Sequence, residues 1–176
     1  DKNIVLGSYF ITTQDTSYIS QTVIQGGINI MGVDSTTHVI GFSISDTENR
    51  ALYIEDDSGI RLNHLYVQNT DGIWLNNSNA FLSDMVVFNN ESGNQGGGLK
   101  IEYSNVHLVN MVIDSNRSGQ TSNHYDGGGV YAYYSTVVMD SVQVTRNSVG
   151  SARGGGIYFY SDGSGDYSLE LSNSDV

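Results

Sequence analysis

The chain has 176 residues, no Pro and no Cys, and a formal net charge of −12. A negative surplus of this size repels phosphate backbones and anionic lipids, which argues against a nucleic-acid partner and a basic membrane-surface role. The absence of Cys excludes a disulfide framework, a thiol nucleophile and a thiolate zinc site. No apolar run approaches the ~20 residues of a membrane span, so we expect no membrane insertion in this segment.

Residues 1–34 predict an irregular start to the chain. Short apolar runs at 4–6, 18–19 and 22–24 predict strands, and the segment 26–30 has the pattern of an early, degenerate coil. We therefore treat 1–34 as irregular N-terminal coils of one domain that spans residues 1–176.

Residues 35–176 contain a regular repeat. The copies begin at Ala51, Gly72, Gly98, Gly129 and Gly156. In the first four copies, the beginning is followed at nearly constant offsets by a Ser, then by a Leu or Met, and then by an Asn. The copies differ in length almost entirely within the stretches 91–95, 117–126 and 148–153. One constant core and one variable loop per copy is typical of a solenoid.

Apolar residues alternate with polar or aromatic residues over three short stretches of each copy. In the copy that begins at Gly72 these are Ile73 and Leu75, Ala80 and Leu82, and Met85 and Val87. A period of two predicts short strands with one face buried, and no stretch keeps helical spacing over three turns. We predict an all-β chain that forms a parallel β-helix, a solenoid of about six to seven coils with three short strands per coil.

Asn and Gly recur at the corners of the predicted coils. Asn tolerates the left-handed conformation, its amide bonds local backbone, and stacked Asn side chains bond one another. Gly reaches positive φ and lets two backbones approach closely. The predicted structural turn ladder consists of Asn69, Asn90, Asn116, Asn147, Gly98, Gly129 and Gly156.

The last copy stops at Val176, the position that Val87 holds in the third strand of an earlier copy. A single coil buries too little apolar surface to be stable alone. We therefore expect a piece of a longer β-helix, or a subunit whose end is covered by something else. End-to-end or lateral self-association is one such arrangement.

Several of these motifs resemble a known family. Ile113-x-x-Asn116 and Val144-x-x-Asn147, each followed by three Gly and an aliphatic residue, resemble the FxxN and GGA-[ILV] repeats of chlamydial polymorphic membrane proteins, with Gly in place of the Ala. The stretch 154–158 (Gly-Gly-Gly-Ile-Tyr) is similar to repeats of secreted bacterial proteins with the pectin-lyase-like fold. The resemblance implies a right-handed, single-stranded β-helix that is extracellular or on the cell surface and is adhesive or architectural.

Pectin-degrading enzymes also have this fold, and the stretch 69–72 (Asn-Thr-Asp-Gly) resembles the NTDG motif of polygalacturonases. Those enzymes need two carboxylates around one glycosidic bond. About one coil later this chain has Asn89 and Asn90, whose amides serve neither as acid nor as base. The later His and Arg-x-Lys elements are missing too. We predict no enzyme activity, with an active or degenerate polysaccharide lyase or hydrolase as the alternative.

The stretch 162–166 (Asp-Gly-Ser-Gly-Asp) alternates residues that offer oxygen ligands. Calcium binds such ligands, but the stretch lacks the Gly and the distal Glu of an EF-hand loop. A solvated loop is the simpler interpretation. We therefore predict no cofactor and no metal site, with calcium at Asp162 and Asp166 as the alternative.

An outward column of aromatic residues is the main functional candidate. The middle outward position of each first strand holds Tyr53, Trp74, Lys100, Tyr131 and Tyr158, and the next outward position holds Tyr133 and Tyr160 in the last two copies. Strands stack ~4.8 Å apart, so the rings would form a flat exposed ladder that can stack on sugars or on a partner protein. Cross-strand aromatic pairs also stabilise a sheet by about 0.5–1 kcal/mol each, so a purely structural role stays open.

We therefore expect a structural or adhesive β-helix module at an extracellular or cell-surface location. It would bind a glycan or a surface protein through Tyr53, Trp74, Tyr131, Tyr133, Tyr158 and Tyr160. One alternative is the polysaccharide-processing enzyme described above. The other is a self-assembling filament or surface-layer subunit.

Overall fold

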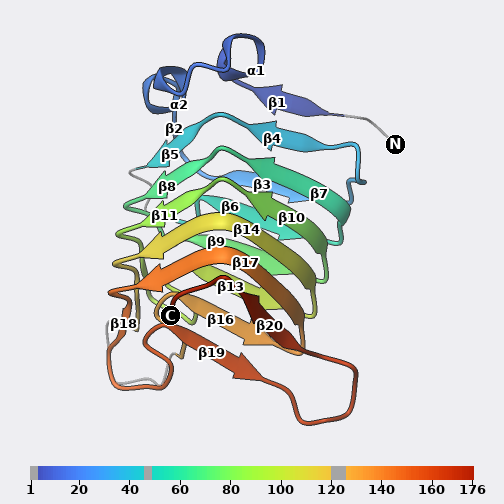
Figure 1. Cartoon of the computed structure of the whole chain (residues 1–176), viewed down its shortest axis with the longest axis vertical. Coiled ribbons are helices and arrows are strands. Elements are labelled where there is room, and N and C mark those ends of the chain that lie inside the picture. The colour runs from blue at the N-terminus through green and yellow to red at the C-terminus, as the bar shows by residue number, and fades with distance from the viewer. Residues whose placement is uncertain (1–3, 46–48, 120–125) are drawn as a thin grey trace.

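Parallel β-strands dominate the chain, and its computed structural model describes residues 4–45, 49–119 and 126–176 (Figure 1). Two short helices, α1 (Phe10–Thr13) and α2 (Ser17–Gln21), lie near the N-terminal end. The prediction of an all-β chain is confirmed in its main feature, since the strands form parallel sheets.

The strands belong to three sheets. The largest contains β1 (Val5–Gly7), β2 (Val23–Gln25), β4 (His38–Ile40), β5 (Ser43–Ser45), β7 (Ser58–Asn63), β8 (Tyr66–Gln68), β10 (Asn79–Ser83), β11 (Val86–Phe88), β14 (Asn105–Asp114), β17 (Thr136–Thr145) and β20 (Leu169–Ser172). The second contains β3 (Ile28–Met31), β6 (Leu52–Glu55), β9 (Ile73–Asn76), β13 (Leu99–Glu102), β16 (Val130–Tyr133) and β19 (Ile157–Tyr160). The smallest contains β12 (Glu91–Ser92), β15 (Arg117–Ser118) and β18 (Ser148–Val149).

Consecutive copies of the repeat pair with each other strand by strand. The strands β6, β7 and β8 are followed by β9, β10 and β11, which pair with them one by one. The register places Leu52 beside Ile73 and Val67 beside Val87. Figure 1 shows the strands stacked along the long axis of the molecule, from the helices at one end to β19 at the other. Residues at the same repeat position therefore form columns along this axis.

The interior is built from the apolar columns that the alternation predicts. Ile73 and Leu75 of β9, Leu82 of β10 and Val87 of β11 are buried, and so are their counterparts in the neighbouring copies. The residues that alternate with them, such as Trp74, Phe81 and Val86, are more exposed, as a period of two requires, and Ser83 at the end of β10 is buried as well. The core is therefore continuous from one copy to the next, and each copy depends on its neighbours for burial.

Two features of the strands differ from the prediction. In the copies that begin at Gly98 and Gly129, the second and third strands are continuous as β14 and β17, which bend at Asn110 and Ser141 (φ +51° and +58°). The stretches expected to be variable loops begin with the short strands β12, β15 and β18, which pair with one another. Residues 120–125 of the longest stretch lie outside the described residues.

The N-terminal strands are predicted only in part. β1 and β2 confirm the strands expected at 4–6 and 22–24, and β3 begins within the segment 26–30, which was expected to be an early, degenerate coil. The strand expected at 18–19 is wrong, because these residues lie in α2. The Asp15 carboxylate accepts the Ser17 N–H (2.9 Å) and so favours a helical turn that two apolar residues could not reveal.

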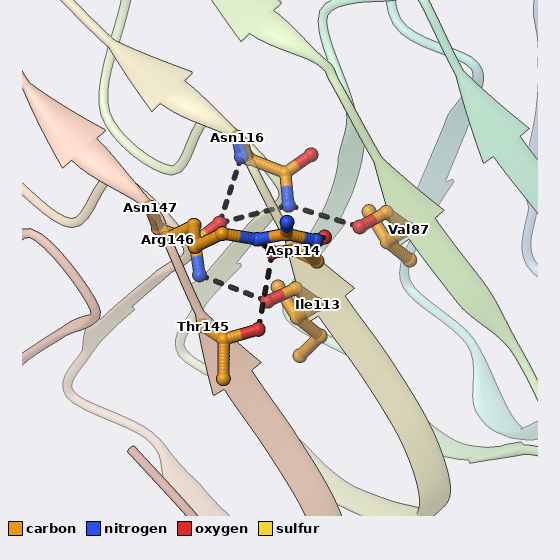
Figure 2. A network of polar contacts seen from close by, with 7 residues as sticks. All are labelled: Val87, Ile113, Asp114, Asn116, Thr145, Arg146 and Asn147. Atoms are coloured by element: carbon orange, nitrogen blue, oxygen red, sulfur yellow. Dashed lines mark hydrogen bonds and ion pairs between the residues drawn. The ribbon is translucent and has the colours of Figure 1, made fainter.

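A buried ladder of amide side chains runs along one corner (Figure 2). Asn116 donates its backbone N–H (2.8 Å) and its side-chain Nδ2 (3.0 Å) to Oδ1 of Asn147, and Nδ2 also donates to the Val87 carbonyl (2.9 Å). Asn90 donates to Asn116 in the same way, and Thr70 donates its N–H and hydroxyl to Asn90. Each amide thereby pairs backbone groups that the corner buries away from water.

Asn69 does not belong to this ladder, contrary to the prediction. It lies one residue earlier, with φ +53°, in the column that continues with Asn89, Ser115 and Arg146, all at positive φ. Asn89 donates its Nδ2 to Oδ1 of Asn69 (2.7 Å). We expected one Asn column to have both the left-handed backbone and the stacked buried amides. These two features belong instead to two adjacent columns.

Arg146 also anchors a buried carboxylate at this corner (Figure 2). Its Nε donates to Oδ1 of Asp114 (2.8 Å), and its Nη2 pairs with Oδ2. The Thr145 hydroxyl donates to the same carboxylate (3.0 Å). The guanidinium holds the pKa of Asp114 below its usual range, so the carboxylate stays ionised and paired near neutral pH.

A second corner is closed by a ladder of Ser side chains. The N–H of Ser78 donates to Oγ of Ser104 (3.0 Å), and the N–H of Ser104 donates to Oγ of Ser135 (3.1 Å). Each hydroxyl in turn donates to the carbonyl two residues before it. In both ladders, one polar side chain per copy therefore forms the hydrogen bonds that water would otherwise form with the buried backbone.

The Gly triplets stack directly on one another. The first Gly of each has positive φ, namely Gly96, Gly127 and Gly154. The last Gly of each triplet is a predicted ladder position. The backbone N–H of Gly98 donates to the carbonyl of Gly129, and that of Gly129 donates to the carbonyl of Gly156 (both 3.1 Å). A Cβ on Gly97 would lie 2.4 Å from the Arg117 backbone and 2.5 Å from the Gly128 carbonyl oxygen. The triplets thus occupy a place where two backbones leave no room for a side chain.

This packing predicts a sharp contrast between two nearby glycines. Gly97→Ala forces backbone atoms apart and should lower the free energy of unfolding by about 1–3 kcal/mol. Gly93→Ala is the matched control, because its Cβ would meet nothing within 4 Å, and we expect a change of less than about 1 kcal/mol. Urea denaturation followed by circular dichroism measures both. Equal losses in the two variants would contradict the stacking of the triplets.

The amide ladder predicts a similar contrast between two Asn residues. Asn116→Ala leaves buried groups of Val87 and Asn90 without partners and should cost about 3 kcal/mol of stability. Asn105→Ala removes one exposed bond to Asn79 (2.9 Å) and should cost less than about 0.5 kcal/mol. The same denaturation measurement applies. A cost at Asn116 no larger than that at Asn105 would show that the ladder is not needed for stability.

Candidate functional site

The expected aromatic column lies on the second sheet, in register along its strands. Tyr53 pairs with Trp74, Trp74 with Lys100, Lys100 with Tyr131, and Tyr131 with Tyr158. The structure therefore brings together the residues of this column as the repeat suggested. Their exposure and their contacts, however, divide the column into two different halves.

The half around Trp74 is occupied by the chain's own cations. The Arg50 guanidinium lies 3.9 Å from the centroid of the Trp74 ring and 5.5 Å from that of Tyr53. The Lys100 ammonium lies 4.2 Å from the Trp74 centroid and 3.0 Å from a carboxylate oxygen of Glu102. The Trp74 indole N–H donates to the same carboxylate (2.9 Å). Trp74 is thus half-buried and is not the free stacking surface that we expected.

The half around Tyr131 consists of rings that cover one another. Tyr131 is only 8% exposed and is stacked on Tyr158, with centroids 5.5 Å apart and an angle of 8° between the rings. Tyr133 is stacked on Tyr160 in the same way, at 5.4 Å and 10°. Burial raises the pKa of Tyr131. Each ring covers part of the next, so the expectation of an exposed ring is wrong for Tyr131, whereas Tyr160 is 39% exposed.

Two tyrosines at an adjacent corner have an unusual backbone conformation. Tyr103 and Tyr134 directly follow β13 and β16 and have φ +51° and +45°. The same corner holds Asp56 and Asn77 in the two earlier copies, also at positive φ. Asp and Asn tolerate this conformation, whereas large side chains rarely adopt it. The last two of these four copies therefore place a large ring where the backbone favours a small polar residue.

We define the tyrosine patch as Tyr103, Tyr133, Tyr134, Tyr160 and Tyr167. Tyr103 and Tyr134 are stacked at 5.9 Å with an angle of 4°. Tyr133, Tyr160 and Tyr167 each meet Tyr134 edge to face, at 4.4, 5.7 and 5.5 Å. Tyr103, Tyr160 and Tyr167 are 55%, 39% and 37% exposed. The patch is therefore a contiguous aromatic surface that faces solvent.

Carboxylates border the tyrosine patch. The Tyr134 hydroxyl donates to Oδ2 of Asp162 (2.8 Å), and this bond raises the pKa of Tyr134. Hydrogen bonds from Ser164, and to a smaller extent the one from Tyr134, lower the pKa of Asp162. The pKa of Tyr103 is raised by desolvation and by the nearby Tyr133 and Glu102. The patch therefore combines aromatic rings with negative charge.

Asp162 and Asp166, the candidate calcium ligands, lie on the exposed segment beside this patch. Asp162 accepts the Ser164 N–H (2.9 Å) in addition to the Tyr134 hydroxyl. In the described ranges 4–45, 49–119 and 126–176, no group of three or more acidic or His side chains could hold a metal ion. The geometry therefore assigns Asp162 a hydrogen-bonding role.

A polar groove of about 480 Å³ lies beside the amide ladder. It is lined by Asn69, Thr70, Asp71, Asn89, Asn90, Glu91, Ser115, Arg117 and Ser148. Burial raises the pKa of Asp71, and Glu91 pairs with Arg117 (3.5 Å). The stretch 69–72 forms a turn here, in which the Thr70 hydroxyl oxygen accepts the Gly72 N–H (2.9 Å).

Four residues of these two surfaces were not predicted from the sequence. Tyr103, Tyr134 and Tyr167 lie outside the strand positions that the alternation identifies, although Tyr134 directly follows Tyr133 in the sequence. Residue 71 was expected to lie beside Asn89 and Asn90 of the next copy. The backbone pairing places Glu91 there instead, because Glu91 donates its N–H to the Thr70 carbonyl (2.9 Å).

No protein-family model, no curated protein and no solved structure matches this chain. The site is therefore assigned from its geometry alone. Neither of the described helices is long and apolar enough to cross a membrane.

The bond between Tyr134 and Asp162 predicts a titration experiment. Because the folded pKa of Tyr134 lies above the value of ~10 for free tyrosine, the bond stabilises the fold below that pH and is lost as the pH rises through the folded pKa. Asp162→Asn removes the charge and should lower the pKa of Tyr134, which NMR of the tyrosine rings can follow. Asp166→Asn removes the same charge from the same segment without breaking the bond. An equal shift in both variants would contradict a specific pair.

Proposed function

We propose that this chain is a right-handed parallel β-helix of an extracellular or cell-surface protein, and that it is a structural and adhesive module. The parallel pairing of each strand with its counterpart in the next copy supports the β-helix. So do the buried columns that continue from copy to copy. The motif resemblance supports the location and the adhesive role.

The observation that carries the adhesive role is the pair of left-handed tyrosines, Tyr103 and Tyr134. A left-handed backbone costs about 1–2 kcal/mol at each of them. Contacts with each other and with the rings of Tyr133, Tyr160 and Tyr167, worth about 0.5–1.5 kcal/mol each, offset that cost, so the ring cluster maintains this conformation. Non-Gly residues held in such a conformation are concentrated at functional sites. We therefore assign adhesion to the tyrosine patch, with a glycan or a surface protein as the ligand.

A second candidate function rests on the polar groove. Asp71, whose pKa burial raises, and Glu91, which pairs with Arg117, line the same groove. Glycoside hydrolysis requires two carboxyl groups, one as the acid and the other as base or nucleophile. Amide and hydroxyl side chains of Asn89, Asn90 and Ser115 would supply hydrogen bonds to a sugar. This arrangement favours a polysaccharide hydrolase over a lyase as the enzymatic alternative.

One experiment separates the two functions. The purified chain is exposed to cellulose, mannan, polygalacturonate and intact bacterial cells, with calcium or with a chelator, and both retention and release of reducing sugars are measured. We expect retention on at least one of these surfaces, without cleavage. The double variant Tyr103→Asn, Tyr134→Asn should weaken retention on the order of tenfold, since each ring contributes roughly 1 kcal/mol. Asn is the residue that an earlier copy has at this corner, so the variant keeps a favourable backbone.

Two further variants complete this test. Tyr9→Ala removes an exposed tyrosine near the N-terminal helices, outside the patch, and should leave retention unchanged. Asp71→Asn should also leave retention unchanged. Release of sugars by the native chain that Asp71→Asn abolishes would replace the adhesive function by the enzymatic one. Retention that survives loss of both patch tyrosines would remove the patch from the proposal.

A further inference from the structure

We propose that the tyrosine patch binds a basic peptide segment of a partner protein, through its rings and the carboxylates beside them. This inference rests on the adhesive function proposed above and names the chemistry of the ligand. Three observations on the second sheet and its corner lead to it. They are an occupied cation site in the aromatic column, a similar set of groups in the patch without a cation, and the charge of the chain.

The chain itself contains a bound cation of the type we propose. The Lys100 ammonium is held between the ring of Trp74 (4.2 Å to the centroid) and the carboxylate of Glu102 (3.0 Å). The Arg50 guanidinium lies over the same ring at 3.9 Å. A cation over an aromatic ring is attracted by the negative face of the ring, and a carboxylate adds charge attraction. The outer face of the second sheet therefore already holds an ammonium group between a ring and a carboxylate, and a guanidinium group over the same ring.

The tyrosine patch offers the same two kinds of group. Tyr134 is bonded to the carboxylate of Asp162 (2.8 Å), and Asp166 lies on the same exposed segment. Within the described ranges, Arg and Lys side chains lie over the rings of Tyr53, Trp74, Phe81 and Tyr158, and over none of the five rings of the patch. Exposed aromatic rings and carboxylates without a cation of their own form a surface that is complementary to Lys and Arg side chains.

The charge of the chain favours a basic ligand over a polysaccharide. The net charge of −12 attracts a basic segment and repels acidic polysaccharides such as polygalacturonate. A neutral glycan would gain hydrogen bonds but no charge attraction. Affinity for a basic peptide should therefore fall as salt is added, whereas affinity for a neutral glycan should change little. This difference makes the two ligand classes experimentally distinguishable.

The test measures binding of a short oligo-arginine peptide to the full chain by calorimetry, at low and at high salt. An oligo-glutamate peptide and a neutral cello-oligosaccharide are measured in parallel. We expect the arginine peptide alone to bind, and to bind less tightly at high salt. Tyr103→Asn with Tyr134→Asn should raise the Kd of the peptide on the order of tenfold, from about twofold to fivefold per ring. Tyr9→Ala should leave the Kd unchanged, and circular dichroism verifies that each variant is folded.

Each remaining outcome decides against the inference. Peptide binding that the double variant leaves intact would show that the peptide responds only to the overall charge of the chain. Salt-insensitive binding of the neutral oligosaccharide, lost in the double variant, would overturn the basic ligand while it supports the adhesive function. If no probe binds and the patch variant is also retained normally on polysaccharides and cells, both proposals fail.

Discussion

The hydrogen bonds between copies of the repeat impose one geometry on every corner of the molecule. Each inner strand bonds to its counterparts in both neighbouring copies, so a corner that deviates would break the register on two sides. The corners also bury backbone groups that water cannot reach. The amide ladder, which ends at Thr70, and the Ser ladder supply those groups with hydrogen-bond partners, one side chain per copy. The stacked Gly triplets meet the same requirement by leaving the space free.

This geometry separates positions that maintain the stack from positions that can vary. Asn116 is fully buried and engaged on several sides, so it has no freedom to change. The left-handed positions at the other corner point to solvent and carry Asp56, Asn77, Tyr103 and Tyr134 in successive copies. A stack of nearly identical copies can thus present different chemistry along its length. The change from small polar residues to tyrosines at one corner is what creates the patch.

The alternation of apolar residues was sufficient to predict the parallel strands and the buried columns, because a period of two has a direct physical cause. Corner positions were harder to predict, because one inserted residue before the corner changes every later offset that is counted from the start of the copy. For that reason Asn69 was placed in the ladder that contains Thr70. Counting from the third strand avoids the error, because Thr70 follows Val67 as Asn90 follows Val87. The burial of Tyr131 and the pairing of Trp74 with Arg50 depend on side-chain packing, which no spacing rule contains.

The short strands β12, β15 and β18 have a consequence for how the gene can change. They re-establish pairing immediately after each amide of the ladder, and the triplet stacking resumes at the next Gly. In the copies that begin at Gly72, Gly98 and Gly129, differences in length are confined to the segment between these two points. An in-frame duplication or deletion of one whole copy therefore joins compatible surfaces and leaves the remaining ladders intact. Unequal recombination can accordingly lengthen or shorten the domain in single steps, without any compensating substitution in its interior.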